Sequence, residues 1–384
     1  MFLLIKNADV YTPNFLGKKD ILTCAGKIIK IEDEIDLPLK DIKVIDGTGK
    51  KIIPGLIDPH IHITGGGGEG SFKTRVPEVM LTDLTKSGIT TVVGLLGTDT
   101  TTRCVENLLA KTKALNEEGI TAYCLTGGYE YPSPTLTGKV KKDITFVNEI
   151  LGVKLAISDH RSSVIQKEEL AKLAADVRVA GMFSGKVGII TLHMGSGKDG
   201  LNTINEILNT TDIPINHFRP AHVARDKKLF DEAMEFAKRG GYIDITTGGS
   251  SGFNSLKDII RTLIEKEVPL EKVTFSSDGN GSLPVFDTNG KLLEIKAAPC
   301  NGVFNSIRKL MIENEFPFEN IIKFATSNVA NSLGIFPEKG CIQEGSSADL
   351  LLLDENFLID TLISKGKIMI ENKNIIVKGT YEKF

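Results

Sequence analysis

Cysteine is scarce in this sequence of 384 residues. The five cysteines stand at positions 24, 104, 124, 300 and 341, and none is spaced as a CxxC pair. An odd and dispersed set does not suit a disulfide framework and is typical of proteins from a reducing compartment. We therefore expect a cytoplasmic protein, in which any metal is held by histidine, by carboxylate or by a less usual ligand.

Long apolar runs and a surplus of positive charge are missing as well. The net charge is −3, which argues against a nucleic-acid partner, because such proteins usually carry a basic surplus or stripe. No segment approaches the roughly 18 uninterrupted apolar residues of a membrane helix. The first ten residues, MFLLIKNADV, have no basic segment and no small-residue cleavage site, so we expect no signal peptide. With 41% hydrophobic and 25% charged residues, we expect an ordinary globular protein with no membrane partner.

The middle of the chain alternates apolar, β-branched runs with amphipathic stretches of helical length, such as residues 103–119, 167–181, 227–241 and 256–267. Continuous apolar strands that alternate with helices indicate a parallel sheet covered on both faces. Eight such units over about 280 residues match a (β/α)8 TIM-like barrel in count and length. A doubly wound open sheet is the alternative, although the glycines at 65–68 do not keep the G-x-G-x-x-G spacing of a dinucleotide site. The eight runs are residues 54–62, 88–98, 120–129, 152–158, 187–195, 215–223, 242–249 and 273–282.

Both ends of the chain read as short strands separated by turns, without a helical period. About 50 residues at the start and about 45 at the end share this pattern. We therefore expect an α/β protein with two domains. Residues 1–53 and 338–384 would form a small β-sandwich from both termini, and residues 54–337 would form the barrel.

Residues able to bind a metal or a charge stand at the ends of the apolar runs. His60 and His62 are one residue apart, and a strand directs residues i and i+2 to the same face. Four of the six histidines in the chain fall at such ends, where a (β/α)8 barrel carries its active site. The residues concerned are His60, His62, Lys154, His193, His222 and Asp278.

Each of these residues also has an ordinary structural interpretation when it is taken alone. A single histidine such as His193 is more often hydrogen-bonded in a core than bound to a metal, and Asp278 precedes a glycine as in a turn. Their joint occurrence at the ends of separate strands favours a functional cluster. His160 and His217 have no such companions, and we interpret both as structural.

Several short stretches carry a family likeness. PGLIDPHIH, SSDGNGS and GCIQEGSSADLLLLD, together with the later strand-end histidines, resemble the amidohydrolase superfamily. GGGGEG, GLLGTD, LLAKTKALNEEGI, GVKLAISDHRSS and FSSDGNGS resemble its bacterial isoaspartyl dipeptidases, and this likeness covers nearly the whole chain. An HxH pair alone is a weak signal, but these stretches together are specific.

The resemblance implies two zinc ions per subunit, bridged by an N6-carboxylated Lys154. His60 and His62 would hold the more buried metal together with Asp278, and His193 and His222 would hold the other. Imidazole and carboxylate oxygen both suit zinc. A buried lysine loses its proton more readily, and its free amine can then add carbon dioxide to become a long-armed carboxylate.

The resemblance also implies a reaction, the hydrolysis of the β-aspartyl amide bond of isoaspartyl dipeptides. A hydroxide that bridges the metals would attack the amide carbonyl. Asp278 would take its proton and pass it to the departing amine, and Tyr129 would donate to the carbonyl oxygen. Tyr131 is out of register with the motif, and we interpret it as structural.

The residues implied to bind substrate surround this centre. Glu69 would receive the free α-amino group, and Arg161 and Arg225 would receive carboxylates, for which the forked guanidinium is suited. Ser282 would lie near the α-carboxylate, and the glycines after the HxH pair let the backbone approach a ligand. The full set is Gly67, Gly68, Glu69, Thr98, Tyr129, Arg161, Arg225 and Ser282.

Two alternatives to a dipeptidase stay open. One is a cyclic-amide hydrolase of the dihydropyrimidinase or dihydroorotase type, which would share the metals but would have no need for Glu69 to bind an amine. The other is a non-catalytic scaffold, which complete retention of the metal-binding set disfavours. Family members form homo-oligomers, so we expect one here. The sequence leaves open the number of subunits, the physiological metal and the residue preferred after isoaspartate.

Overall fold

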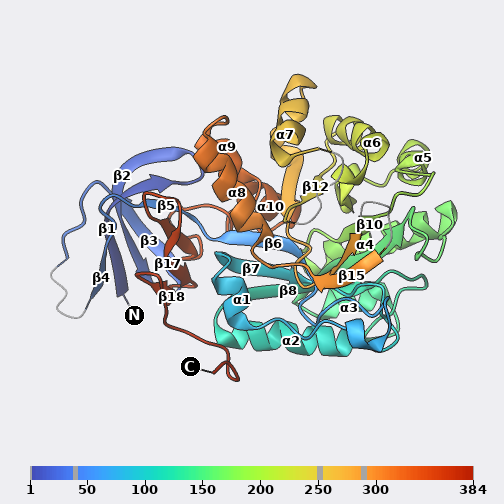
Figure 1. The fold of residues 1–384 in the computed structure, drawn as a ribbon, viewed down its shortest axis with the longest axis horizontal. Coiled ribbons are helices and arrows are strands. Elements are labelled where there is room, and N and C mark those ends of the chain that lie inside the picture. Colours follow the sequence, from blue (N-terminus) through green and yellow to red (C-terminus); the bar gives the residue numbers. More distant parts are fainter. Residues whose placement is uncertain (1, 38–41, 249–253, 287–291, 384) are drawn as a thin grey trace.

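Both ends of the chain contribute to one sheet, and the middle of the chain forms a barrel surrounded by helices (Figure 1). This computed structural model describes residues 2–37, 42–248, 254–286 and 292–383. Along the longest axis of the molecule, the sheet lies at one end and the barrel at the other (Figure 1). Within the described residues, no helix is long and apolar enough to cross a membrane.

Eight parallel strands make the barrel, and they pair in their order along the chain. A bridge between Ile61 and Gly279 brings the first and last strands together, so that the barrel is nearly closed. This approach of the two edges distinguishes the fold from a doubly wound open sheet, and the predicted (β/α)8 barrel is confirmed. The strands are β6 (Leu56–Ile61), β7 (Ile89–Gly94), β8 (Thr121–Gly127), β9 (Ile150–Ile157), β10 (Ile189–Met194), β11 (Phe218–Ala221), β12 (Ile243–Thr246) and β13 (Val273–Ser276).

The barrel strands are apolar because both of their faces are covered. Every residue of β6, β7, β9 and β10 is buried, as expected for parallel strands between a barrel interior and an outer layer of helices. Each of the eight predicted runs overlaps one barrel strand, although β9 begins two residues before its predicted run. Polar side chains within these runs are therefore inside the protein, where each of them needs a partner.

Helices connect the strands and cover the barrel. They are α1 (Leu81–Thr85), α2 (Val105–Glu118), α3 (Val140–Phe146), α4 (Lys167–Ser184), α5 (Asn202–Thr210), α6 (Lys227–Lys238), α7 (Leu256–Glu265), α8 (Gly302–Glu313), α9 (Phe318–Lys323) and α10 (Ser327–Ser332). The helices predicted from amphipathic spacing, α2, α4, α6 and α7, are confirmed. Short 3-10 helices lie at Phe72–Thr74, Ile215–His217, Val223–Arg225 and Leu270–Lys272.

The sheet from the two chain ends is continuous. Its strands are β1 (Phe2–Tyr11), β2 (Phe15–Cys24), β3 (Lys27–Glu32), β4 (Lys43–Asp46), β5 (Lys51–Pro54), β16 (Leu350–Leu353), β17 (Ile359–Ser364), β18 (Lys367–Glu371) and β19 (Asn374–Ile375). The two ends of the chain meet where β5 pairs antiparallel with β16, with Ile53 opposite Leu351. One apolar cluster includes residues from both ends, as the predicted β-sandwich requires. The predicted domain boundaries at 53/54 and 337/338 stay a prediction.

Strand β16 explains how the sheet is attached to the barrel. Its four residues are all leucines and all buried. Leu350 and Leu352 belong to the core of the terminal sheet, whereas Leu351 and Leu353 belong to the core of the barrel. Because alternate side chains of a strand point to opposite faces, a continuous apolar run can serve two cores at once.

A hairpin that the sequence did not predict follows the last barrel strand. It consists of β14 (Ser282–Phe286) and β15 (Leu292–Ala297), which pair antiparallel with Ser282 opposite Ala297. The hairpin reaches the glycine-rich loop after β6, since a Cβ atom at Gly70 would lie 2.8 Å from Cδ1 of Ile295. The hairpin and this loop therefore meet beside Glu69.

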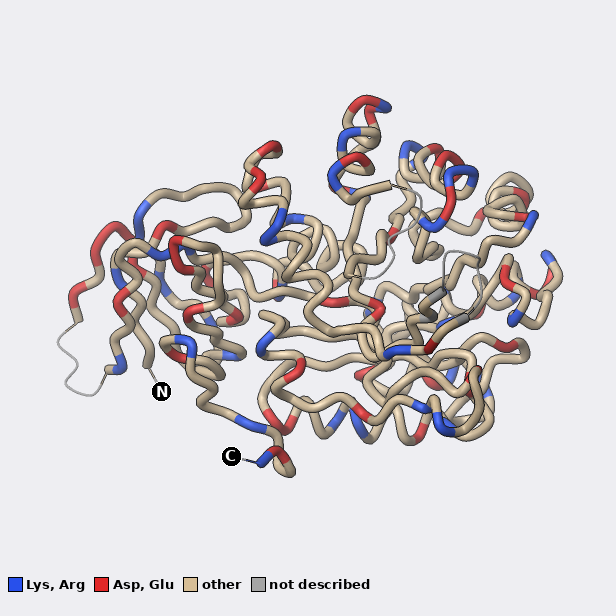
Figure 2. The backbone as a smooth tube through the Cα atoms, viewed as in Figure 1, with Lys and Arg blue, Asp and Glu red and all other residues tan. Residues whose placement is uncertain are grey.

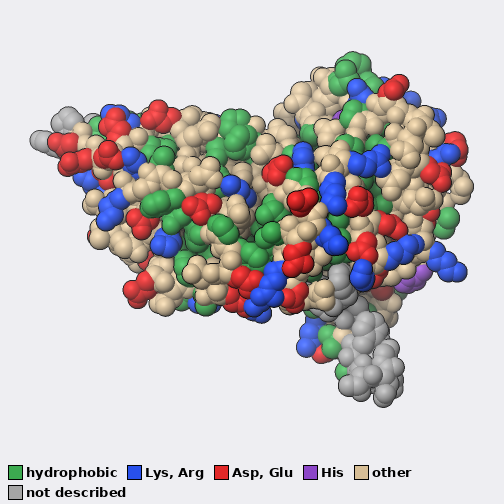
Figure 3. All heavy atoms as spheres, turned by 90° about the horizontal axis from the view of Figure 1, so that it is seen from above, with side chains coloured by type: hydrophobic (Ala, Val, Ile, Leu, Met, Phe, Trp, Pro, Cys, Tyr) green, Lys and Arg blue, Asp and Glu red, His purple; other side chains and the backbone are tan. Residues whose placement is uncertain are grey.

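Charges of both signs are distributed over the surface. Lysine and arginine alternate with aspartate and glutamate along the chain, and helices α6 and α7 carry both signs (Figure 2). The face seen from above shows positive and negative side chains next to one another (Figure 3).

Candidate metal and substrate site

The six predicted metal-site residues lie in five barrel strands or directly after them. His60 is in β6, Lys154 in β9 and His193 in β10, whereas His62, His222 and Asp278 follow β6, β11 and β13. His222 and Asp278 have φ angles of 62° and 53°, the left-handed region that non-glycine residues seldom adopt. Such backbone strain is common at functional sites. Here it occurs at the two turns that carry these side chains into the barrel mouth.

His60, His62, Lys154 and Asp278 form the deeper part of the cluster. Nε2 of His60 lies 2.9 Å from Nζ of Lys154 and 3.4 Å from Oδ1 of Asp278. Nε2 of His62 lies 3.2 Å from the same carboxylate oxygen. Both imidazoles of the HxH pair thus turn the same ring nitrogen toward one aspartate, as the alternation of side chains along a strand predicts.

His193 and His222 extend the cluster toward the opening of the barrel. The ring of His222 packs edge to face on His60 and on His193, with centroids 4.8 Å and 4.6 Å apart. Nδ1 of His222 lies 2.5 Å from Oγ1 of Thr246, while its Nε2 is buried without a hydrogen-bond partner. Among the described residues, the ligand atoms of His60, His222 and Asp278 lie within 4.8 Å of one another.

The protonation states in the cluster suit a divalent metal. Burial lowers the pKa of His60, His193 and His222 well below the usual value, so these imidazoles are neutral and each has a lone pair to give. For Asp278, burial raises the pKa, but the surrounding His222, His62 and Lys154 outweigh it, and the net effect lowers the pKa. The partnerless Nε2 of His222, the neutral imidazoles and the ionised carboxylate together fit a metal site.

Lys154 is the unusual member of the cluster. Its side chain is completely buried in β9. Burial lowers the pKa of the Lys154 amine to about 7, against the opposing effect of Asp278 and Asp244. An ammonium group has no lone pair for a metal, whereas an amine that loses its proton near neutral pH can react at nitrogen.

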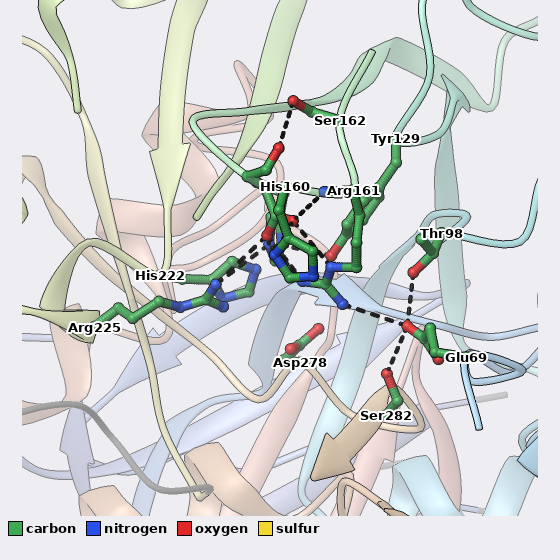
Figure 4. Close-up of polar contacts among 12 residues, drawn as sticks. Glu69, Thr98, Tyr129, His160, Arg161, Ser162, His222, Arg225, Asp278 and Ser282 are labelled. Carbon is green, nitrogen blue, oxygen red and sulfur yellow. Dashed lines mark hydrogen bonds and ion pairs between the residues drawn. The ribbon is translucent and has the colours of Figure 1, made fainter. Parts of the chain in front are cut away.

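Glu69 is the centre of a second group of polar contacts, which lies beside the histidine cluster (Figure 4). Its Oε1 accepts hydrogen bonds from Oγ1 of Thr98 at 2.7 Å, from Oγ of Ser282 at 3.1 Å and from Nη1 of Arg161 at 3.4 Å. Burial raises the pKa of Glu69, but the hydrogen bonds from Thr98 and Ser282 and the charge of Arg161 lower it overall. Residues from three other segments of the chain therefore contact the negative charge of Glu69 at the barrel mouth.

Tyr129 and the two predicted arginines connect the two groups. Oη of Tyr129 lies 2.7 Å from Nδ1 of His193, and the guanidinium of Arg161 lies over the tyrosine ring, 5.3 Å from its centroid. Burial raises the pKa of Tyr129, so its hydroxyl keeps its proton. Nη1 of Arg225 lies 3.4 Å from Nε2 of His193.

The two predicted glycines and the two histidines interpreted as structural differ in their surroundings. Gly67 and Gly68 have φ angles of 79° and 103°, and a Cβ atom at Gly67 would lie 2.3 Å from the carbonyl oxygen of Thr74. His160 has 88% of its side chain exposed, outside the histidine cluster. His217 is buried away from the cluster and donates from Nδ1 to the carbonyl oxygen of Gly188 at 2.6 Å.

Three residues of the site were not predicted from the sequence. Asp159 accepts from His193 and Arg161, and Thr246 contacts His222. The carboxylate of Asp58 accepts from the backbone N–H groups of His60 and Ser277, each at 3.1 Å, and so joins the ends of β6 and β13. Asp159 and Thr246 stand at the carboxyl ends of β9 and β12, the same signal that identified the histidines.

Comparisons with known proteins agree with this geometry. The profile of the amidohydrolase family matches residues 52–369. The crystal structure of a β-aspartyl dipeptidase from Fervidobacterium islandicum AW-1 in complex with β-Asp-Leu is 43% identical, covers 98% of this chain and 97% of its own, and has a TM-score of 0.92. A second structure of β-aspartyl dipeptidase from the same organism is 41% identical, covers 98% of both chains and has a TM-score of 0.90.

A curated relative gives a more local match. Dihydropyrimidinase 2 of Caenorhabditis briggsae is 43% identical over 63 residues, which is 16% of this chain and only 12% of the relative. The likeness to the two F. islandicum structures, by contrast, spans nearly the full length of both partners.

The position of His222 predicts that it is needed for metal binding. The substitution His222→Asn removes the buried Nε2 that has no other partner. We expect metal affinity to fall by more than the roughly 10–100-fold that accompanies the loss of an outer-shell group. Zinc bound per chain, measured by mass spectrometry after dialysis against a chelator buffer, gives the result. His160→Asn is the matched control, because His160 lies exposed outside the cluster, and equal metal content in the two variants would refute the assignment.

Proposed function

The chain belongs to the amidohydrolase family, and we propose that it is a metal-dependent dipeptidase that hydrolyses the β-aspartyl amide bond of isoaspartyl dipeptides. The two similar structures at 41% and 43% identity are β-aspartyl dipeptidases, and one of them is in complex with β-Asp-Leu. The single observation that carries the proposal is the arrangement of charges next to the histidine cluster. One carboxylate, Glu69, and two guanidinium groups, Arg161 and Arg225, surround it.

This arrangement of charges suits a β-aspartyl dipeptide. Such a dipeptide has one free α-amino group, one α-carboxylate and one C-terminal carboxylate. Glu69 keeps its negative charge and would bind the amine. Arg161 and Arg225 would bind carboxylates through charge-assisted hydrogen bonds, which are stronger than neutral ones. Thr98 and Ser282, which already donate to Glu69, would complete the binding surface.

We propose that the metals are two zinc ions. His60 and His62 would hold one of them with Asp278, His193 and His222 would hold the other, and a carboxylated Lys154 would lie between them. The lowered pKa of Lys154 supports carboxylation, because only the unprotonated amine can add carbon dioxide. Zinc ions bound there would supply activation of water at neutral pH and polarisation of the scissile carbonyl.

The protein groups would perform the proton transfers and orient the substrate. Asp278 is ionised, which supports a role in which it would accept a proton from the attacking water and deliver it to the departing amine. The Tyr129 hydroxyl keeps its proton and would donate to the carbonyl oxygen as negative charge develops on it. Removing one such donor typically costs about 10²–10³ in rate.

We also propose that the protein works as a homo-oligomer in the cytoplasm. All five cysteines are free, which supports a reducing compartment. The number of subunits stays open.

A cyclic-amide hydrolase is the second candidate. The local match to a dihydropyrimidinase favours it, and the same metal residues would serve. Glu69 distinguishes the two candidates. Its carboxylate receives three hydrogen bonds and would bind a free α-amine, which a cyclic amide does not have.

Hydrolysis of β-Asp-Leu and α-Asp-Leu by the zinc-loaded protein tests the proposal. We expect release of aspartate and leucine from the β isomer only, because the α isomer places its carboxylates and amine at different distances from the scissile bond. Chromatography of the free amino acids measures the product. Absence of cleavage with β-Asp-Leu, together with ring opening of dihydrouracil or a hydantoin, would replace the dipeptidase by the second candidate.

Lys154→Ala should remove metal and activity together. We expect a loss of about 10³-fold or more, because a metal contributes several kcal/mol to the transition state and each 1.36 kcal/mol is a factor of ten. Short carboxylic acids should partly restore activity by supplying the missing bridging carboxylate. Zinc per chain and hydrolysis rate are measured in parallel, with Lys198→Ala on an exposed loop as control. A Lys154→Ala variant that keeps two zinc ions and its activity would exclude the bridging role.

Glu69→Gln should weaken turnover without loss of metal. We expect kcat/KM for β-Asp-Leu to fall about 10–100-fold, since hydrogen bonds to charged groups contribute roughly 1.5–3 kcal/mol. The difference between variant and wild type should disappear with N-acetyl-β-Asp-Leu, which lacks the charged amine. Glu78→Gln is the control, because Glu78 is an exposed acid after the same loop. Unchanged kinetics of Glu69→Gln with β-Asp-Leu would remove Glu69 from the substrate site.

A further inference from the structure

Asp159 is a buried carboxylate to which the proposed function gives no role. Only 3% of its side chain is exposed. Oδ1 accepts hydrogen bonds from Nε of Arg161 at 2.9 Å and from the backbone N–H of the same residue at 2.8 Å. Oδ2 accepts from Nη2 of Arg161 at 2.9 Å and contacts Nε2 of His193 at 3.0 Å. One carboxylate therefore joins a proposed substrate-binding arginine to a proposed metal ligand.

The contact with Asp159 determines which nitrogen of His193 carries the proton. Asp159 pairs with Arg161 at two points, through Nε and Nη2, so its carboxylate acts as an acceptor there. Nε2 of His193 lies 3.0 Å from Oδ2 of this carboxylate. Nε2 is therefore the donor in this contact and carries the ring proton.

With its proton on Nε2, His193 carries its lone pair on the opposite nitrogen, Nδ1. This nitrogen lies 2.7 Å from the Tyr129 hydroxyl and accepts from it, a hydrogen bond that a metal bound at Nδ1 would replace. The guanidinium nitrogens of Arg161 and Arg225 lie 3.5 Å and 3.4 Å from Nε2. These contacts are longer than the one to Asp159. They are not hydrogen bonds, because two N–H groups cannot bond to each other. They arise because both arginines lie near the carboxylate of Asp159, from which Arg225 is 3.9 Å distant.

We propose that Asp159 is a positioning residue that holds His193 as its Nε2–H tautomer, with Nδ1 as the metal-binding atom, and at the same time fixes the direction of Arg161. Carboxylates that accept from the second nitrogen of a metal-bound histidine orient the ring and increase its basicity. The inference rests on the proposed function for the roles of His193 and Arg161.

Asp159 also limits what Arg161 can offer to a ligand. Its two hydrogen bonds occupy Nε and Nη2 of the guanidinium. Nη1 remains and points toward Glu69 and the Ser282 side of the site (Figure 4). Arg161 would therefore contact a substrate carboxylate through Nη1 in one fixed direction, whereas Arg225 makes only the longer contact to Asp159.

The experiment compares Asp159→Asn and Asp159→Glu with a matched control. Asp226→Asn removes the same charge nearby but does not contact His193, and Asn replaces Asp well as the N-cap of α6. Zinc affinity is measured by competition with a chelator, and kcat and KM are measured with β-Asp-Leu. The tautomer of His193 is read from long-range ¹H–¹⁵N spectra of protein labelled at its six histidines, with His193→Gln for assignment.

We expect Asp159→Asn to bind one of two zinc ions about 10–100-fold more weakly and to lose the exclusive Nε2–H tautomer of His193. KM should rise as Arg161 loses its ionic partner, Asp159→Glu should recover part of both losses, and Asp226→Asn should behave as wild type. Wild-type zinc affinity with an unchanged tautomer in Asp159→Asn would overturn the proposal. If that variant does not fold, the wild-type spectrum decides, because an Nδ1–H tautomer of His193 would overturn it equally.

These measurements separate the proposal from the proposed function. The zinc affinity and the tautomer of His193 do not depend on which amide is hydrolysed. A protein that fails to cleave β-Asp-Leu but shows the Nε2–H tautomer and the zinc loss in Asp159→Asn would retain Asp159 as a positioning residue and reject the dipeptidase.

Discussion

The close packing of buried polar groups at the carboxyl ends of the barrel strands is the constraint on which the site depends. Imidazoles, an amine and a carboxylate are packed against one another there. An unpaired polar group in such a place is costly, and a buried charge is more so. In this cluster the cost is reduced because the imidazoles are neutral. Their lone pairs are directed toward a common centre. A divalent cation bound there would accept these lone pairs, as we propose.

Four carboxylates lie at different depths of the site, and each has different partners. Asp58 joins the ends of β6 and β13 through backbone N–H groups, which holds the HxH pair and Asp278 in register across the closing edge of the barrel. Asp278 faces the histidines. Asp159 joins His193 to Arg161, and Glu69 gathers donors at the mouth. These carboxylates thus form a series, from Asp58 between two strands, through Asp278 and Asp159 beside the histidines, to Glu69 at the barrel mouth.

Sequence reasoning found the fold and the histidine cluster because both depend on local patterns. Apolar runs with buried faces predict strands, and residues i and i+2 of a strand share a face, which makes His60 and His62 a recognisable pair. The β14–β15 hairpin lacked such a pattern, and the position of Asp159 after a strand does not reveal which side chains it contacts. His193 is 34 residues from Asp159 and Ser282 is 213 residues from Glu69, so their pairing depends on how the loops meet in space. Asp159 resembled an ordinary loop acid until its neighbours were visible.

The most direct test of this account is a zinc titration of chelator-treated protein, with bound zinc and aspartate release from β-Asp-Leu followed in the same sample. If the buried cluster is a two-metal hydrolytic centre, activity should be absent without metal, should rise as zinc is bound and should level off at two equivalents per chain. Full activity in metal-free protein, or no activity with two equivalents bound, would contradict the account.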